Sequence, residues 1–280
     1  METVTSLADL RTHRIRLREP VGLVPTMGYL HEGHLSLVHA SMAQCASTVV
    51  SIFLNPTQFG PREDLNAYPR DLSRDLDQLG AAGVDLAWTP TAEIMYPLGF
   101  QTWVTVEEIA SPLEGSLRPG HFRGVATVVS KLFNAVQPQK AFFGQKDAQQ
   151  VAVILQMTQD LNFNLEIIVC PTVRESDGLA MSSRNVYLNP HEREAAVVLY
   201  KALIAASRAF KNGEHDAQKL RNTLIEEIHK EPLAKLQYVS CADINTLKEL
   251  EEVSSGRALL SMAVFFGNTR LIDNMIIGVD

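Results

Sequence analysis

The sequence predicts an α/β fold, with a doubly wound parallel sheet in the N-terminal part and a smaller α+β domain after it. Three observations predict this fold. Short apolar, β-branched runs alternate with helical patterns as far as residue 169, and after Pro171 the pattern changes to long helices followed by further strands. The chain has 280 residues, 46% of them hydrophobic and 20% charged, which is enough for two domains with sizeable cores.

The first domain is expected to cover residues 1–175. Its expected strands are residues 21–24, 48–54, 84–88, 141–143 and 165–169, and its clearest expected helices are residues 35–42, 72–79, 125–136 and 148–161. Strands that alternate with helices pair in parallel, so this domain is predicted to be Rossmann-like. Ligands of such sheets bind beyond the carboxyl ends of the strands.

The second domain is expected to cover residues 176–280. Residues 175–178 have the composition of a turn, and two long helices are expected at 190–211 and 216–230. Three strands are expected after these helices, at residues 236–239, 258–266 and 271–277, with a turn at 267–269. These elements together predict an antiparallel α+β layer.

Charge and cysteine content argue against several classes of function. The net charge of −7 disfavours a surface that binds nucleic acid. The three cysteines form no C-x-x-C pair, so neither a disulfide framework nor a zinc knuckle is expected, and a reducing compartment fits best. The N-terminus lacks a basic stretch followed by an apolar one, and no apolar run is long enough to cross a membrane. We therefore expect a cytoplasmic protein with no membrane or nucleic-acid partner.

Two histidines stand where the strand at 21–24 runs through a tight turn into a helix. His31 and His34 are three residues apart and share a helical face, and Gly33 between them permits a ligand to approach the backbone closely. Backbone N–H groups and the helix dipole favour an anion at such a junction. This arrangement predicts phosphate binding. The alternatives are a structural role and zinc binding, but no nearby cysteine or histidine supplies a third zinc ligand.

Three further stretches carry polar or charged side chains at expected strand ends or at the domain junction. Gln58 lies in the loop 55–60, and its neutral amide can bind a carboxylate without lowering its nucleophilicity as an ion pair would. The alternative is that this loop is an ordinary polar turn. Lys146 follows the strand at 141–143 and would supply a mobile positive charge, unless it is a solvated surface lysine. Arg184 can fork onto phosphate oxygens, and the serines before it could equally cap a helix.

Two other stretches are weaker candidates. The loop at 118–124 contains two arginines and a histidine, and it is expected to be a flap over a phosphate or an inter-subunit loop. Asp75 lies in a helical stretch with Asp71 and two arginines. These carboxylates could bind Mg²⁺ or form exposed ion pairs with the arginines.

Together these stretches closely resemble the family of pantoate–β-alanine ligases, and the resemblance covers essentially the whole chain. It rests on an ordered set of motifs at residues 25–28, 31–34, 55–60, 68–70, 118–122, 144–150 and 181–185. The His-x-Gly-His motif alone would indicate only the wider nucleotidylyltransferase superfamily. The whole set, in this order, is far more specific.

The resemblance implies an ATP-dependent ligase that condenses pantoate with β-alanine to pantothenate. The reaction would pass through a pantoyl adenylate and release AMP and pyrophosphate. Mg²⁺ is expected to accompany ATP, and the protein is expected to be a homodimer whose smaller domain closes over the active site. ATP, pantoate and β-alanine are thus the expected small-molecule partners.

The resemblance also implies roles for individual residues. The residues expected to be catalytic are His31, His34, Lys146 and Arg184. The residues expected to bind ATP are Met27, Gly28, Tyr29, Leu30, His31, Glu32, Gly33, His34, Gly144, Gln145, Lys146, Asp147, Val173, Met181, Ser182, Ser183 and Arg184. Pantoate is expected to be held by Gln58 and Gln150, which divides the site into a charged half and a neutral half.

Two departures from the family pattern bear on this assignment. Gln145 stands where many relatives carry Glu, which should not affect ATP binding. Arg74 and Asp75 stand where some relatives show adjacent acids. We therefore expect Mg²⁺ to be held mainly by the nucleotide phosphates and water, with Asp75 as the candidate protein ligand.

Two rival functions use the same histidine motif or the same nucleotide. A nucleotidyltransferase would stop after moving a nucleotide onto a phosphate-bearing acceptor, and it would need more cations directed at that acceptor. Gln58 and Gln150 instead favour a substrate that has a carboxylate and hydroxyl groups. A nucleotide-binding regulator would not need a lysine, an arginine and two histidines around the leaving phosphates.

Overall fold

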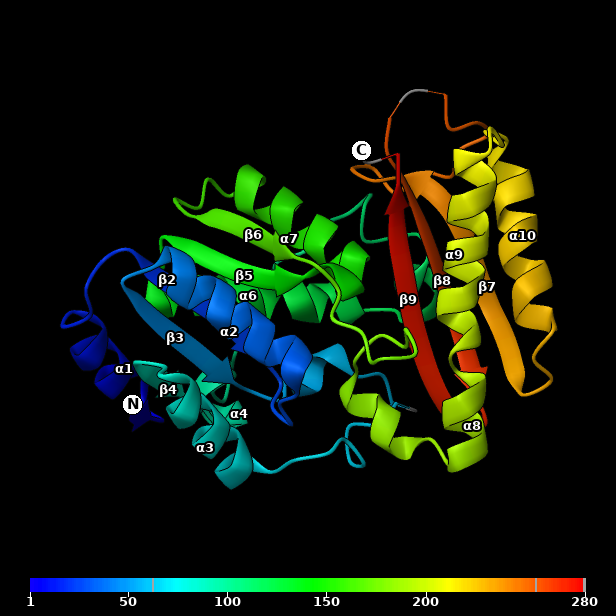
Figure 1. Ribbon diagram of the computed structural model, residues 1–280. Coiled ribbons are helices and arrows are strands. Elements are labelled where there is room, and N and C mark those ends of the chain that lie inside the picture. The colour runs from blue at the N-terminus through cyan, green and yellow to red at the C-terminus, as the bar shows by residue number, and fades with distance from the viewer. Residues whose placement is uncertain (62, 255, 279–280) are drawn as a thin grey trace. The chain divides into compact units, whose positions relative to one another are not determined.

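The computed structural model describes residues 1–61, 63–254 and 256–278, and the chain divides into two compact units (Figure 1). The first unit consists of Met1–Gln145 and Val153–Pro171, and the second consists of Lys146–Ala152 and Thr172–Asp280. We predicted one domain boundary between residues 175 and 176. The chain leaves the first unit for the second after Pro171, and the short segment Lys146–Ala152 groups with the second unit.

Within the described part of the first unit, six parallel strands form one sheet in the order β1-β4-β3-β2-β5-β6. The strands are β1 (Glu2–Val4), β2 (Val21–Thr26), β3 (Ser47–Ile52), β4 (Leu86–Trp88), β5 (Lys140–Gly144) and β6 (Glu166–Cys170). The prediction of a doubly wound, Rossmann-like sheet is confirmed. The edge strand β1 was not predicted, because its three residues are too few to show a pattern.

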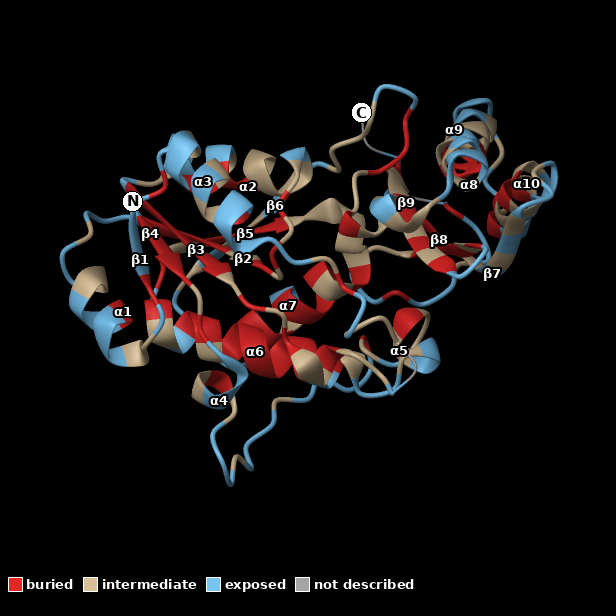
Figure 2. Ribbon diagram, turned by 90° about the horizontal axis from the view of Figure 1, so that it is seen from below, coloured by how far each residue is buried: buried red, intermediate tan, exposed pale blue. Residues whose placement is uncertain are grey.

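Helices cover both faces of this sheet: α2 and α3 lie on one face, and α1 and α6 lie on the other (Figure 2). The helical elements of the first part of the chain are α1 (Leu7–Arg14), α2 (Glu32–Gln44), α3 (Leu72–Ala82), α4 (Ala92–Met95), α5 (Glu114–Leu117), α6 (His121–Val136), α7 (Ala148–Asp160) and the 3₁₀ turns η1 (Pro56–Gln58) and η2 (Gln145–Asp147). Because the central strands are covered on both faces, they read as continuous apolar runs rather than as alternating ones. In β2, Val21, Leu23 and Val24 are all completely buried.

The second unit is an α+β layer, as predicted. In the residues that the structure describes, β7 (Ala234–Asp243), β8 (Ala258–Phe266) and β9 (Thr269–Ile277) form an antiparallel sheet. Helices α9 (Val198–Lys211) and α10 (Ala217–His229) pack on this sheet through a core that includes Leu203, Leu224 and Met262 (Figure 1). The remaining elements are η3 (Ser183–Tyr187) and α8 (Pro190–Ala195).

One predicted helix of the second unit is wrong in its extent. We expected a single helix over residues 190–211, and the structure has two, α8 and α9, separated by Ala196 and Val197. The β-branched residues Val197 and Val198 stand at the interruption. Side chains of this type lose χ1 freedom against the preceding helical turn, which weakens the helix there.

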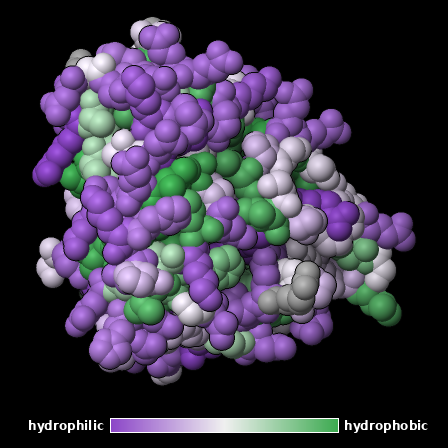
Figure 3. Space-filling model, turned by 90° about the vertical axis from the view of Figure 1, so that its right-hand side faces the viewer, coloured by the Kyte–Doolittle hydropathy of each residue, from purple (hydrophilic) through white to green (hydrophobic). Residues whose placement is uncertain are grey.

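No helix in the described ranges is both long and apolar enough to cross a membrane. On the face drawn in Figure 3, hydrophilic residues predominate, and hydrophobic ones gather near its middle.

Packing between β2 and α2 generates a first prediction. A Cβ added at Gly22 would lie 2.1 Å from Ser41 Oγ and 3.1 Å from the Phe142 ring. The Ser41 hydroxyl is buried and hydrogen-bonded to the Thr48 hydroxyl, so it cannot easily move away from an added Cβ. We expect Gly22→Ala to lower the free energy of unfolding by about 2 kcal/mol, as overpacked cores do.

Urea unfolding measures this change, and Gly80→Ala is the matched control. Gly80 lies in α3, and a Cβ there meets only a methionine tip at 4.0 Å. The control should therefore stabilise the helix by up to about 1 kcal/mol. Equal effects of the two substitutions would contradict the packing argument.

Candidate active site

The expected site residues of the first unit lie at the carboxyl edge of its sheet. Strand β2 stands at the centre, where the chain order reverses: β3 and β4 follow on one side, and β5 and β6 on the other. Such a switch point opens a crevice beyond the strand ends. Because the strands are parallel, the histidine motif after β2, the Gln58 loop after β3 and the end of β5 all leave the sheet at this edge.

The turn between β2 and α2 has an unusual backbone that a buried carboxylate holds in place. Gly28 and Tyr29 both have positive φ, at 85° and 53°. The Asp75 side chain accepts hydrogen bonds from the N–H groups of Tyr29 and Leu30, each at 2.7 Å, and Asp75 is only 1% exposed. Arg74, the preceding residue of α3, lies over the Tyr29 ring and donates to the Leu30 carbonyl. One end of α3 therefore fixes the turn that leads to the histidines.

The two histidines form the N-terminal cap of α2. His31 is the N-cap, and its Nδ1 accepts from the Gly33 N–H at 3.1 Å, while Nδ1 of His34 accepts from the His31 N–H at 3.4 Å. The ring centroids are 4.1 Å apart. Because Nδ1 is an acceptor in both rings, the neutral imidazoles carry their proton on Nε2. Each ring is thus in the tautomer that can donate from Nε2 to an anion at the helix N-terminus.

Gln58, at the end of η1, is held through its main chain by the loop at 118–124. His121 Nδ1 lies 2.8 Å from the Gln58 carbonyl, and Arg118 Nη1 lies 3.2 Å from His121 Nε2. A carbonyl only accepts and a guanidinium only donates, so His121 is neutral with its proton on Nδ1. We expected this loop to be a flap or an inter-subunit loop. Its histidine and arginine hold the main chain of Gln58, and its role as a flap or an inter-subunit loop stays a prediction.

The same interaction explains the ionisation of the groups around Gln58. Burial, together with the charge of Arg118, lowers the pKa of His121 from 6.5 to about 4. Arg118 forms a two-pronged ion pair with Glu63, with both contacts at 2.7 Å. Burial alone would raise the Glu63 pKa, but hydrogen bonds and charge from Arg118 hold it below its ordinary value. The histidine stays neutral, and the charges beside it are paired.

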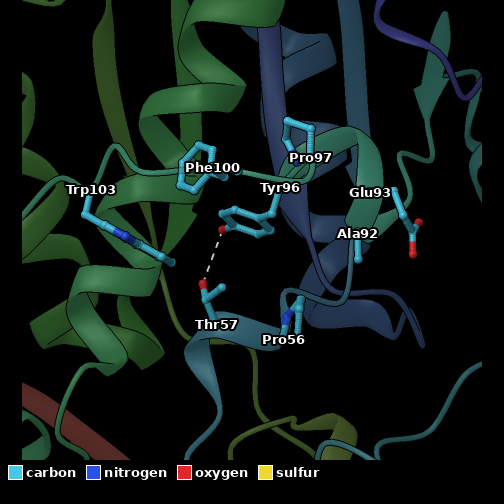
Figure 4. A pocket seen from close by; sticks show the side chains of 9 residues that line it. Pro56, Thr57, Ala92, Glu93, Tyr96, Pro97, Phe100 and Trp103 are labelled. Carbon is cyan, nitrogen blue, oxygen red and sulfur yellow. Dashed lines mark hydrogen bonds between the residues drawn. The ribbon is translucent and has the colours of Figure 1, made fainter.

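Asn55 supports η1 from the other side and is fully engaged in doing so. Its Oδ1 accepts from the Thr57 and Tyr96 hydroxyls, both at 2.9 Å, and its amide donates to the Gly124 carbonyl at 3.2 Å. Thr57 and Tyr96 also border an open pocket of about 370 Å³ that Phe100 and other side chains line (Figure 4). Asn55 therefore shapes the loop. Of the two side-chain amides in the loop, that of Gln58 stays the candidate for binding pantoate.

The remaining expected site residues belong to the second unit. The Lys146 side chain is half-buried, and its Nζ lies 3.8 Å from Asp147 Oδ1. Ser182 caps η3 by accepting from the Arg184 N–H at 3.2 Å, so its local capping role is present. Met181 and Val173 are joined by a backbone hydrogen bond of 3.0 Å. These residues are half-buried.

The expected site is thus divided between the two units. The residues of the motif 27–34, Gln58, Gly144 and Gln145 lie in the first unit, while Lys146, Asp147, Gln150, Val173 and residues 181–184 lie in the second. Within the first unit, His31 and His34 are brought together, as predicted. That both sets surround one nucleotide stays a prediction.

Asp75 does not fit the expected role of a metal ligand. Both of its oxygens already accept backbone N–H groups, which a bound cation would compete with. Among residues 1–61, 63–254 and 256–278, no group of three or more His, Cys, Asp or Glu side chains is arranged to hold a metal ion. That Mg²⁺ is held mainly by the nucleotide phosphates and water stays a prediction, and no chemical step below depends on a protein metal ligand.

Comparisons with known proteins agree with the motifs. The family model described as "Pantoate-beta-alanine ligase" matches residues 1–276. A pantothenate synthetase of Roseiflexus sp. (strain RS-1) is 58% identical over 277 residues, which are 99% of each chain. A pantothenate synthetase of Acetivibrio thermocellus is 56% identical over 280 residues, covering 100% of this chain and 99% of its own.

Solved structures lead to the same family. Pantothenate synthetase from Thermus thermophilus superposes with a TM-score of 0.94 at 47% identity, covering 98% of this chain and 99% of its own. A pantoate-β-alanine ligase from Francisella tularensis, complexed with β-γ ATP and β-alanine, has a TM-score of 0.80 at 35% identity, with 99% and 97% covered. The match extends over both units.

The Asp75 contacts generate a second prediction. In Asp75→Asn, the amide keeps one acceptor oxygen but turns an N–H group toward a backbone donor. Hydrogen bonds to a charged group contribute about 1.5–3 kcal/mol, so we expect the free energy of unfolding to fall by roughly 2 kcal/mol. Urea unfolding measures the change, and Asp77→Asn, at an exposed position of the same helix, is the control. A loss no larger than that of the control would show that Asp75 does not hold the turn.

The His121 pKa generates a third prediction. Between pH 6.5 and about 4 the unfolded chain binds a proton at this residue and the folded chain does not, so folding stability falls as the pH falls through this range. This pKa shift corresponds to a loss of about 3 kcal/mol in folding stability, and the loss is complete once the pH lies below the folded-state pKa. His121→Asn keeps a donor for the Gln58 carbonyl but cannot titrate. Urea unfolding across this range should show a shallower pH dependence for the variant, and identical slopes would contradict the buried neutral histidine.

Proposed function

Because the chain belongs to the pantoate–β-alanine ligase family, we propose that it makes pantothenate in two steps through a pantoyl adenylate. The family membership identifies it as an enzyme, a ligase. The observation that carries the proposal is the family match over residues 1–276, which includes the paired histidines at the start of α2. ATP and β-alanine are supported as substrates by the Francisella tularensis complex.

In the first proposed step, a pantoate carboxylate oxygen attacks the α-phosphorus of ATP. A bond forms between that oxygen and phosphorus, and the bond from phosphorus to the bridging oxygen of pyrophosphate breaks. The substrate carboxylate is the nucleophile, so the protein needs none of its own. Catalysis then consists of positioning the reactants and stabilising negative charge on the departing pyrophosphate.

The residues of the chain divide this work by charge. We assign His31, His34, Lys146 and Arg184 to phosphate oxygens, because their N–H groups donate to anions. Gln58 and Gln150 are assigned to pantoate, whose carboxylate must stay reactive and would be blunted by a strong ion pair. The held main chain of Gln58 supports this assignment, since it limits where the amide can reach.

In the second proposed step, the unprotonated amine of β-alanine attacks the acyl carbon of the adenylate. A carbon–nitrogen bond forms, the bond from carbon to the phosphate oxygen breaks, and AMP leaves while the amine loses its proton. Water would hydrolyse the same mixed anhydride, so the intermediate has to stay bound and shielded. We propose that Mg²⁺ enters with the ATP phosphates, and that the enzyme is a cytoplasmic homodimer.

A fourth prediction tests the reaction itself. Incubation of the protein with ATP, Mg²⁺, pantoate and β-alanine should yield pantothenate, AMP and pyrophosphate in equal amounts, measured by chromatography. Without β-alanine, pantoate should support exchange of labelled pyrophosphate into ATP, because the first step is reversible on the enzyme. Transfer of AMP to a product that keeps it would favour a nucleotidyltransferase instead.

A fifth prediction concerns Lys146. Lys146→Ala should lower pantoate-dependent pyrophosphate exchange by about 10²–10³-fold, the cost of losing one charge-assisted contact made in the transition state. Lys140→Ala is the matched control: Lys140 begins β5, and its ammonium pairs with Glu166 at 3.2 Å. The control should retain its exchange rate. Undiminished exchange in Lys146→Ala would remove this lysine from the first step.

A further inference from the structure

Two consecutive residues of β9 bind two separate segments that carry expected ATP contacts. The Asn274 side-chain amide donates to the Lys146 carbonyl at 2.8 Å. Asp273, its neighbour, binds Arg174 through two contacts of 2.7 and 2.9 Å. All of these residues lie in the second unit. Successive side chains of a strand point to opposite faces, so β9 holds one segment on each face.

The Asp273 contact holds a tight hairpin. Arg174 and Ala180 form an antiparallel bridge, and the backbone bond from Met181 to Val173 closes the hairpin. Val173 and Met181 are both expected ATP contacts. Because Arg174 lies beside Val173 and binds Asp273, it fixes the hairpin against β9.

The burial of these groups makes the arrangement rigid. The Asp273 side chain is completely buried, and the Arg174 guanidinium also donates to the Gly178 carbonyl at 3.1 Å and lies 4.5 Å from the centre of the Tyr200 ring. A buried charge that loses its partner is strongly destabilising, so this pair does not open readily. Asn274 is 5% exposed, and its own N–H donates to Asp273 Oδ1 at 2.7 Å. The Asn274–Lys146 contact and the Asp273–Arg174 contact are thus linked through adjacent residues of β9.

We propose that Asn274 is a positioning residue for Lys146, and that Asp273 positions the Val173–Met181 hairpin from the same strand. This inference rests on the proposed function, in which Lys146 contacts the ATP phosphates. Asn274 binds the lysine's main chain, so it fixes where the side chain starts without using its ammonium. Neither β9 residue touches a substrate in this account.

The inference is tested by a double-mutant cycle between Asn274 and Lys146. Asn274→Ala should lower kcat and pantoate-dependent pyrophosphate exchange by about 10- to 100-fold, the cost of misplacing a catalytic group by about 1 Å. In the Lys146→Ala background the same substitution should change the rate by less than about twofold, because the residue through which it acts is gone. Asn274→Leu, which keeps the branching and the number of side-chain heavy atoms but cannot donate a hydrogen bond, should behave in the same way if Asn274→Ala folds poorly.

Ser261→Ala is the matched control for lost packing in this sheet. Ser261 pairs with Asn274 in register on β8, it is buried, and within the described residues its hydroxyl has no hydrogen-bond partner. This variant should retain the wild-type kcat. Asp273→Asn should instead raise the KM for ATP by about tenfold with a smaller change in kcat, because the hairpin binds the nucleotide and the lysine acts on the phosphates.

The outcomes separate this inference from the proposed function. A wild-type protein that makes pantothenate, with Asn274 variants of unchanged kcat, overturns the inference alone. An equal loss of rate in the wild-type and Lys146→Ala backgrounds also overturns it, since Asn274 would then act by another route. A wild-type protein that makes no pantothenate refutes the proposed function, and the inference fails with it.

Discussion

The candidate site of the first unit depends on the buried carboxylate of Asp75. Two residues in succession, Gly28 and Tyr29, take a left-handed backbone, which most side chains avoid. The turn is stable because Asp75 accepts hydrogen bonds from the N–H groups of Tyr29 and Leu30, and an unsatisfied buried donor would be costly. The turn ends at His31, so the carboxylate determines where α2 begins and where both imidazoles lie.

Neighbouring side chains hold the main chain of the residues that we assign to substrates. His121 holds the Gln58 carbonyl, and Asn274 holds the Lys146 carbonyl. A contact to the main chain fixes the start of a side chain without using its amide or ammonium group. This arrangement suits a reaction in which catalysis is mainly positioning, because the precision is built into the strands and helices behind the site.

Charge burial around these supports follows one rule in both units. Arg118 is paired with Glu63, and Arg174 is paired with Asp273. His121, which lies between Arg118 and Gln58, is neutral. Buried charges repay their desolvation only when paired with good geometry, so each pair is worth little as a source of stability but costly to break. Each of these ion pairs therefore holds its part of the site in one arrangement.

The sequence by itself determined the alternation of strands and helices, the strand-to-helix junction at His31 and His34, and the family. These are local patterns, readable from residues a few positions apart. Only the tertiary structure shows the contacts that Asp75, His121 and Asn274 make, including the hydrogen bonds by which Asp75 supports the turn before His31. Their partners lie 45, 63 and 128 residues away along the chain. No periodicity connects such positions, because only the folded sheet brings them within hydrogen-bond distance.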